Sequence, residues 1–144
     1  MRKTFNKNDI EKVAKEILGE LEARSQSLGA MVVALSGDLG AGKTTLTQTI
    51  ARELGVRENV ISPTFILMKS YELRGSPFKN LVHIDAYRFD SYHELERLGW
   101  DKIISDKTNL VLLEWPEKVS EIIPESAIKI KLSHINENER EIEY

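Results

Sequence analysis

A glycine-rich segment between a short apolar run and an amphipathic stretch constrains this sequence more than any other feature. The segment follows the pattern G-x-x-x-x-G-K-[ST], which is typical of loops that bind nucleotide phosphates. Residues 30–36 before it have the composition of a buried parallel strand. In residues 45–54 after it, apolar side chains recur every four positions, as in a helix. The loop consists of Gly37, Asp38, Leu39, Gly40, Ala41, Gly42, Lys43 and Thr44, and Thr45 follows it.

The chemistry of such a loop follows from its backbone. Glycines let the chain wrap around a phosphate, so that successive amide groups and the positive end of the following helix face the anion. We expect Lys43 to reach the β- and γ-phosphates and the hydroxyl of Thr44 to ligate Mg²⁺. The alternative is a glycine-rich turn followed by an ordinary exposed lysine. The strand and helix patterns on either side of the loop argue against it.

Composition limits the class of protein. The chain has 144 residues, no cysteine and a formal net charge of −3. This length favours one domain, residues 1–144, with a core that needs no disulfides. No run approaches the ~20 apolar residues of a membrane span, and no signal-peptide pattern follows the first residues, so we expect a soluble, cytoplasmic protein. Because basic residues are not in excess, we expect any contact with nucleic acid to be made through another subunit.

Hydrophobic periodicity predicts the remaining elements. Spacings of three and four residues predict a helix from about residue 10 to residue 27. A short helix is expected after Ser91, ending at Gly99. The turn at 75–77 predicts an antiparallel return, so the fold class is α/β, with a mixed, mainly parallel sheet between helices. Strands are expected at residues 65–73, 81–85, 110–114 and 127–132, with an edge strand at 141–144 and a strand or arm at 1–5.

Two acids at the ends of apolar strands are candidates for the metal side of the site. In α/β sheets, ligands bind outside the carboxyl ends of the strands, and Mg²⁺ prefers oxygen ligands. Glu114 ends the more continuous run, and we expect it to contact the metal directly or through water. Asp85 is expected to be a second metal-side or water-orienting acid. Each could instead be a solvated carboxylate at a strand end or a helix cap.

Four other residues are weaker candidates. Thr64 could sense the γ-phosphate from its loop or be a turn hydroxyl. Arg88 could supply transition-state charge, although a surface ion pair is the simpler interpretation. His83 alternates with apolar neighbours, and we interpret it as structural. Trp115 could stack on a base, but packing is the commoner role of a tryptophan.

Four blocks of this sequence, in the expected order and at about the expected spacing, together resemble the TsaE (YjeE) family of small bacterial ATPases. The resemblance covers nearly the whole chain. The first block is the loop itself with Thr45. The others are Ser62-Pro63-Thr64-Phe65, His83-Ile84-Asp85-Ala86-Tyr87-Arg88 and Leu113-Glu114-Trp115.

The resemblance implies a role in making threonylcarbamoyladenosine at position 37 of tRNAs that read codons starting with A. It implies ATP and Mg²⁺ as cofactors and a TsaD–TsaB complex as the partner, in which TsaD performs the carbamoyl transfer, so that tRNA is met only indirectly. By the same resemblance Thr44 and Glu114 are metal ligands, and Asp85 is needed for hydrolysis. Thr64 would lie in a switch-like loop, and the arm around Phe5 would lie near the adenine.

Two other functions stay open at this point. A small-molecule kinase would use the same loop, but it needs an acceptor pocket, a lid and a base, and no long basic lid segment is visible. A nucleotide-dependent switch or adaptor would bind partners according to nucleotide occupancy, with incidental hydrolysis. We expect hydrolysis by the chain alone to be weak, because no arginine finger is assured and a partner would complete the site.

Overall fold

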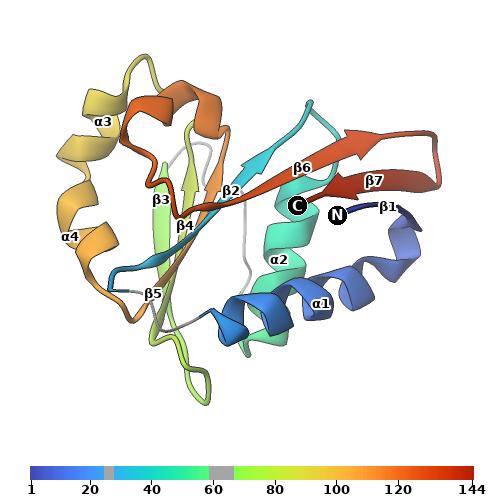
Figure 1. The fold of residues 1–144 in the computed structure, drawn as a ribbon, viewed down its shortest axis with the longest axis horizontal. Helices are drawn as coiled ribbons and strands as arrows, with labels where there is room; N and C mark the ends of the chain where they lie inside the picture. Colours follow the sequence, from blue (N-terminus) through green and yellow to red (C-terminus); the bar gives the residue numbers. More distant parts are fainter. Residues whose placement is uncertain (25–27, 59–66) are drawn as a thin grey trace.

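The fold is a mixed, mainly parallel sheet between two groups of helices (Figure 1). The structure is a computed structural model that describes residues 1–24, 28–58 and 67–144. The seven strands follow the order β1-β7-β6-β2-β5-β4-β3. They are β1 (Arg2–Asn6), β2 (Met31–Ser36), β3 (Met68–Glu72), β4 (Asn80–Asp85), β5 (Asn109–Glu114), β6 (Ile128–His134) and β7 (Glu139–Glu143). The α-helices are α1 (Ile10–Ala23), α2 (Lys43–Glu53), α3 (Tyr92–Arg97) and α4 (Trp100–Ser105), and the 3-10 helices are η1 (Lys7–Asp9) and η2 (Pro116–Ile122).

The centre of the sheet is parallel and its two edges are antiparallel. Strand β2 pairs in parallel with β5 and β6, and β5 pairs in parallel with β4. Strand β4 returns antiparallel to β3, and β7 lies between β6 and β1 and is antiparallel to both. The α/β fold class and the antiparallel return before β4, both predicted from the sequence, are therefore confirmed.

Helices cover both faces of the central strands, which explains their continuous apolar sequences. Every residue of β5 is buried. Its side chains alternate between two apolar clusters: Leu110 and Leu112 join α1 and α2, whereas Val111 and Leu113 join α3, α4 and η2. Figure 1 shows these two helix groups on opposite sides of the sheet. Burial on both faces thus holds the carboxyl ends of β2, β4 and β5 in fixed positions.

The helices next to the central strands form for local reasons. Helix α1 buries Val13, Ile17 and Leu21 at the predicted helical spacing. The Asn6 side chain caps η1, just before α1, by accepting a hydrogen bond from the backbone N–H of Asn8 at 2.9 Å. After α2, Gly55 takes a left-handed φ of 87°, which is favourable for glycine at a helix end.

Several boundaries differ from the sequence expectation. The last strand is not at the edge, because β1 pairs along it from Arg2 opposite Glu143 to Asn6 opposite Glu139. Helix α1 ends at Ala23, four residues before the expected end, and residues 25–27 lie outside the described ranges. Only part of the strand expected at 65–73 is seen, as β3, because residues 59–66 also lie outside them. Within the described ranges, no helix is long and apolar enough to cross a bilayer.

Candidate functional site

The glycine loop leaves β2 and enters α2 with a backbone that its glycines permit. Gly37, Gly40 and Gly42 have φ values of 138°, 79° and 106°, which L side chains rarely adopt. Gly37 is also sterically required: a Cβ atom there would lie 2.2 Å from the carbonyl oxygen of Leu132 on β6. Gly40 and Gly42 face open space. The start of the loop is therefore fixed against the sheet, while its middle keeps room for a ligand.

Lys43 lies inside this loop, with only 5% of its surface exposed. Its Nζ donates to the backbone carbonyl oxygens of Gly37 and Asp38, at 2.5 and 2.8 Å. It also lies 4.4 Å from the ring centroid of Trp115, within cation–π range. Burial lowers the pKa of Lys43 below its ordinary value, and nearby carboxylates, that of Glu114 foremost, oppose this effect. An anion in the loop would favour the charged ammonium further.

The two predicted acids meet at the end of the sheet next to α2. Asp85 and Glu114 are the last residues of β4 and β5, and the register places them opposite each other. They are 5% and 2% exposed. The hydroxyl of Thr44, in the first turn of α2, donates to Oε1 of Glu114 at 3.0 Å. This hydroxyl and carboxylate are hard oxygen donors of the kind that Mg²⁺ takes.

The donor set fits magnesium better than a metal held by protein ligands alone. Among the described residues, no group of three or more His, Cys, Asp or Glu side chains is arranged to hold a metal ion. Mg²⁺ usually keeps several waters and binds through one or two protein oxygens together with substrate phosphates. Thr44 and Glu114, beside a loop shaped for phosphates, match that pattern.

Most of the predicted site residues line one hollow of about 320 Å³. Gly37, Asp38 and Ala41 belong to the loop but not to this lining. Asp85 is held there by its own turn, because its Oδ1 accepts a hydrogen bond from the backbone N–H of Tyr87 at 3.0 Å. The lining residues are Leu39, Gly40, Gly42, Lys43, Thr44, Thr45, Asp85, Tyr87, Glu114 and Trp115.

Outside the loop, two predicted residues do not line this hollow, and a third lies outside the described part of the chain. Arg88 is exposed and does not line it. Phe5 lies on β1 in the apolar core with 9% of its surface exposed, and β7 and β6 separate its strand from β2. Thr64 lies outside the described residues. The roles assigned to these residues stay predictions.

The structure adds three residues to the site, and for one of them, Trp115, the sequence offers base stacking as the less common alternative. His83 is fully buried, as a structural histidine would be, but its Nε2 lies 2.5 Å from Oε2 of Glu114. Trp115 has a left-handed φ of 60°, and its ring lies 4.9 Å from that of Tyr87. The alternation of side chains along a strand could have indicated that His83 lies near the site, because it puts residues 83 and 85 on the same face. No comparable signal indicated Tyr87.

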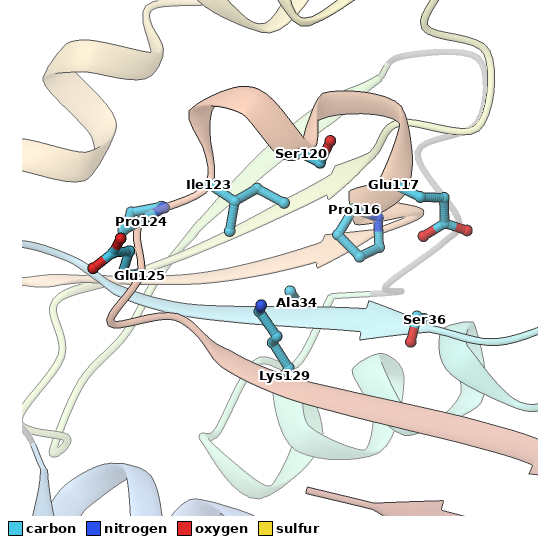
Figure 2. Close-up of a pocket in the computed structure, with 9 residues that line it drawn as sticks. All are labelled: Ala34, Ser36, Pro116, Glu117, Ser120, Ile123, Pro124, Glu125 and Lys129. Carbon is cyan, nitrogen blue, oxygen red and sulfur yellow. The ribbon is translucent and has the colours of Figure 1, made fainter.

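A second hollow, of about 420 Å³, lies on the opposite face of the sheet (Figure 2). Ala34 and Ser36 of β2 and Lys129 of β6 form one wall, and η2 with the segment after it forms the other. Neither Asp85 nor Glu114 lines it. Among the described residues, the buried charges of Lys43, Asp85 and Glu114 meet the glycine loop on the α2 side, so we place the candidate site there. The remaining lining residues are Pro116, Glu117, Ser120, Ile123, Pro124 and Glu125.

Comparison with known proteins gives consistent results for sequence and fold. Residues 4–142 match the family model described as threonylcarbamoyl adenosine biosynthesis protein TsaE. Proteins named tRNA threonylcarbamoyladenosine biosynthesis protein TsaE from Haemophilus influenzae, Bacillus subtilis and Streptomyces coelicolor are 40%, 38% and 39% identical to this chain. These matches cover 75%, 78% and 80% of this chain and 66%, 68% and 76% of the relatives' lengths.

A solved structure agrees with the sequence matches. The crystal structure of YdiB from Bacillus subtilis superposes with a TM-score of 0.70 at 26% identity, and the match covers 99% of this chain and 83% of that one. The resemblance carried by the four sequence blocks is thus confirmed.

Proposed function

Because the chain belongs to the TsaE family, we propose that it is a magnesium-dependent ATPase in the threonylcarbamoyladenosine modification of tRNA at position 37, in tRNAs that read codons starting with A. One observation carries the proposal. A glycine loop, a buried lysine and a hydroxyl–carboxylate pair converge on one hollow, where Lys43, Thr44 and Glu114 lie together. This is the set of groups that phosphoryl transfer from a nucleotide requires.

Each group has a distinct task in this proposal. The loop amides and the first turn of α2 would bind the β- and γ-phosphates of ATP, and Lys43 would exchange its carbonyl partners for phosphate oxygens. Thr44 and Glu114 would hold Mg²⁺, with Asp85 beside them, and the ion would neutralise charge on the transferred phosphoryl group. Asp85, already fixed by its turn with Tyr87, would orient the attacking water.

The partner is proposed to be a TsaD–TsaB complex, with tRNA met only through it. Two observations support a partner-dependent activity. The chain has a net charge of −3, which does not favour phosphate-backbone contacts. Arg88, the arginine nearest in sequence to Asp85, does not line the hollow. A group from the partner would then complete the stabilisation of transition-state charge, and hydrolysis by the isolated chain would be weak. The cytoplasm is the proposed location.

A reconstitution that separates binding from hydrolysis tests this proposal. Purified TsaD and TsaB, tRNA and ATP with Mg²⁺ would be combined with the wild-type chain or with Asp85→Asn, which keeps the loop and Lys43. We expect wild type to support many rounds of modification and Asp85→Asn to bind ATP but support few. Repeated modification by a variant that binds ATP but does not hydrolyse it would favour the adaptor function. Phosphate transfer to an added hydroxylated metabolite would favour a kinase.

A further inference from the structure

Both oxygens of the Glu114 carboxylate have a protein partner, and the partners come from different elements. Oε1 accepts a hydrogen bond from Thr44 of α2 at 3.0 Å. Oε2 lies 2.5 Å from Nε2 of His83 on β4. The side chains of His83 and Glu114 are 0% and 2% exposed, so water does not compete for the contact. The Thr44 side faces the hollow, and His83 is not among the residues that line it.

The surroundings of the ring favour one position for its proton. Nδ1 of His83 is buried and has no hydrogen-bond partner within the part of the chain that the structure describes. A neutral imidazole protonated at Nδ1 would bury an unpaired N–H and would place the Nε2 lone pair against the carboxylate. Protonation at Nε2 satisfies the contact with Glu114 and leaves only an acceptor without a partner. The hydrogen bond therefore runs from His83 to Glu114.

We propose that His83 is a positioning residue for Glu114. By donating from Nε2 to Oε2, it fixes the rotation of the carboxylate so that Oε1 faces Thr44 and the metal side of the hollow. Outer hydrogen bonds of this kind orient a metal ligand, and their loss typically costs about 10–100-fold in metal affinity. This inference rests on the proposed function, because it assigns a task to His83 at the same magnesium site.

A purely structural role for His83 predicts something different. The histidine would then fill space on the α2 side of β4, and an apolar residue of similar size would serve as well. Loss of His83 removes one partner of a buried pair and should lower stability whichever role it has. Stability alone therefore does not separate the two roles, whereas the magnesium requirement of nucleotide binding does.

Two variants with different hydrogen-bonding capacity test the proposal. His83→Leu removes the donor, and His83→Gln keeps an N–H at about the reach of Nε2. Calorimetry would measure ATP binding at a series of Mg²⁺ concentrations and without Mg²⁺. We expect His83→Leu to raise the Mg²⁺ concentration for half-maximal binding about tenfold or more, with metal-free ATP binding unchanged. His83→Gln should restore most of the loss. A wild-type magnesium requirement in folded His83→Leu would overturn the proposal.

The wild-type protein gives a second, independent measurement. Nitrogen-15 NMR of the histidine rings, assigned with His83→Gln, would report which nitrogen carries the proton. We expect Nε2 of His83 to be protonated, and an unprotonated Nε2 would overturn the proposal even if His83→Leu did not fold. If wild type bound no ATP in Mg²⁺, the proposed function would fail. The NMR result would still decide whether His83 donates to Glu114, so the two failures are distinguishable.

Discussion

The charged side chains of this protein occupy two contrasting environments. At the end of the sheet beside α2, Lys43, Asp85 and Glu114 are each 5% exposed or less. On the antiparallel wing formed by β1, β6 and β7, charges pair at the surface. Arg2 contacts Glu141 and Glu143 there, at 3.6 and 3.0 Å, and these side chains are 28–64% exposed.

The contrast shows what buried charge is for in this fold. Removing an ion from water costs several kcal/mol even after relaxation, and a buried charge adds little stability unless its partners are ideal. Within the described residues, Lys43 donates hydrogen bonds to two backbone carbonyl oxygens, and burial lowers its pKa. Surface pairs such as those of Arg2 involve almost no such cost and contribute little. The buried set therefore fits a ligand, and the wing set fits solubility and strand pairing.

The largest effect is expected for Lys43→Ala. Loss of one preorganised charge should lower ATP hydrolysis about 10²-fold or more, and it should abolish the rise in melting temperature that ATP with Mg²⁺ gives. The stability of the nucleotide-free protein should change far less, because the gain from removing a buried ammonium opposes the loss of its contacts with the loop carbonyls and Trp115. The matched control is Lys131→Ala, which removes an exposed lysine on β6. Wild-type turnover in Lys43→Ala would contradict both the comparison and the assignment.

Glu114→Gln and Asp85→Asn test the other half of the buried set. Each removes one negative charge with little change in shape, and we expect about 10–10²-fold slower hydrolysis in either variant. Glu114→Gln should also raise the Mg²⁺ concentration needed for ATP binding, since its carboxylate contacts Thr44. Glu143→Gln on the wing is the control. Normal hydrolysis by both site variants would show that the metal assignment is wrong.

Trp115→Leu should have a smaller effect. The indole ring lies over Lys43, and a cation–π contact of a desolvated lysine is worth roughly 2 kcal/mol. We expect urea unfolding to give about 1–2 kcal/mol less stability than wild type for the nucleotide-free protein. Trp115→Phe keeps an aromatic face and should lose less. Equal losses in the two variants would mean that the ring contributes by packing alone, without a contribution from its contact with the ammonium.

The same two regions show which parts of the fold the sequence predicts. A continuous apolar run, as at 110–114, indicates a strand covered on both faces, and alternation, as at 127–132, indicates a strand covered on one face. Both segments are strands in the structure. The position of β7 could not be predicted this way. Its second neighbour, β1, is at the other end of the chain, and pairing between distant segments leaves no local pattern.

The site divides in the same way between local and non-local information. The loop and the positions of Asp85 and Glu114 follow from a motif and from strand ends, which are local features. The contact between His83 and Glu114 depends on the register of β4 against β5, and the indole of Trp115 reaches Lys43 from a residue with left-handed φ. Neither the register nor that backbone angle can be predicted from residue types alone.

The smallest effect is expected for Arg2→Gln, which tests the wing side of the comparison. The hydrogen bond from Arg2 lowers the pKa of Glu143 below its ordinary value of 4.5. A carboxyl whose pKa is lowered on folding contributes stability above its unfolded pKa and loses it as the pH falls through the folded value. We therefore expect Arg2→Gln to lower the melting temperature at pH 7 by less than about 2 °C.

This small difference should disappear in two conditions. Acid, well below pH 4.5, should remove it because the carboxyl is protonated, and about 1 M salt should remove it because exposed charges are screened. Hydrolysis of ATP should not change in this variant, since β7 and β6 separate β1 from β2 and the loop. A large, salt-resistant loss of stability would instead show that the charges of the wing hold β1 in place. Burial would then no longer distinguish the two sets of charges.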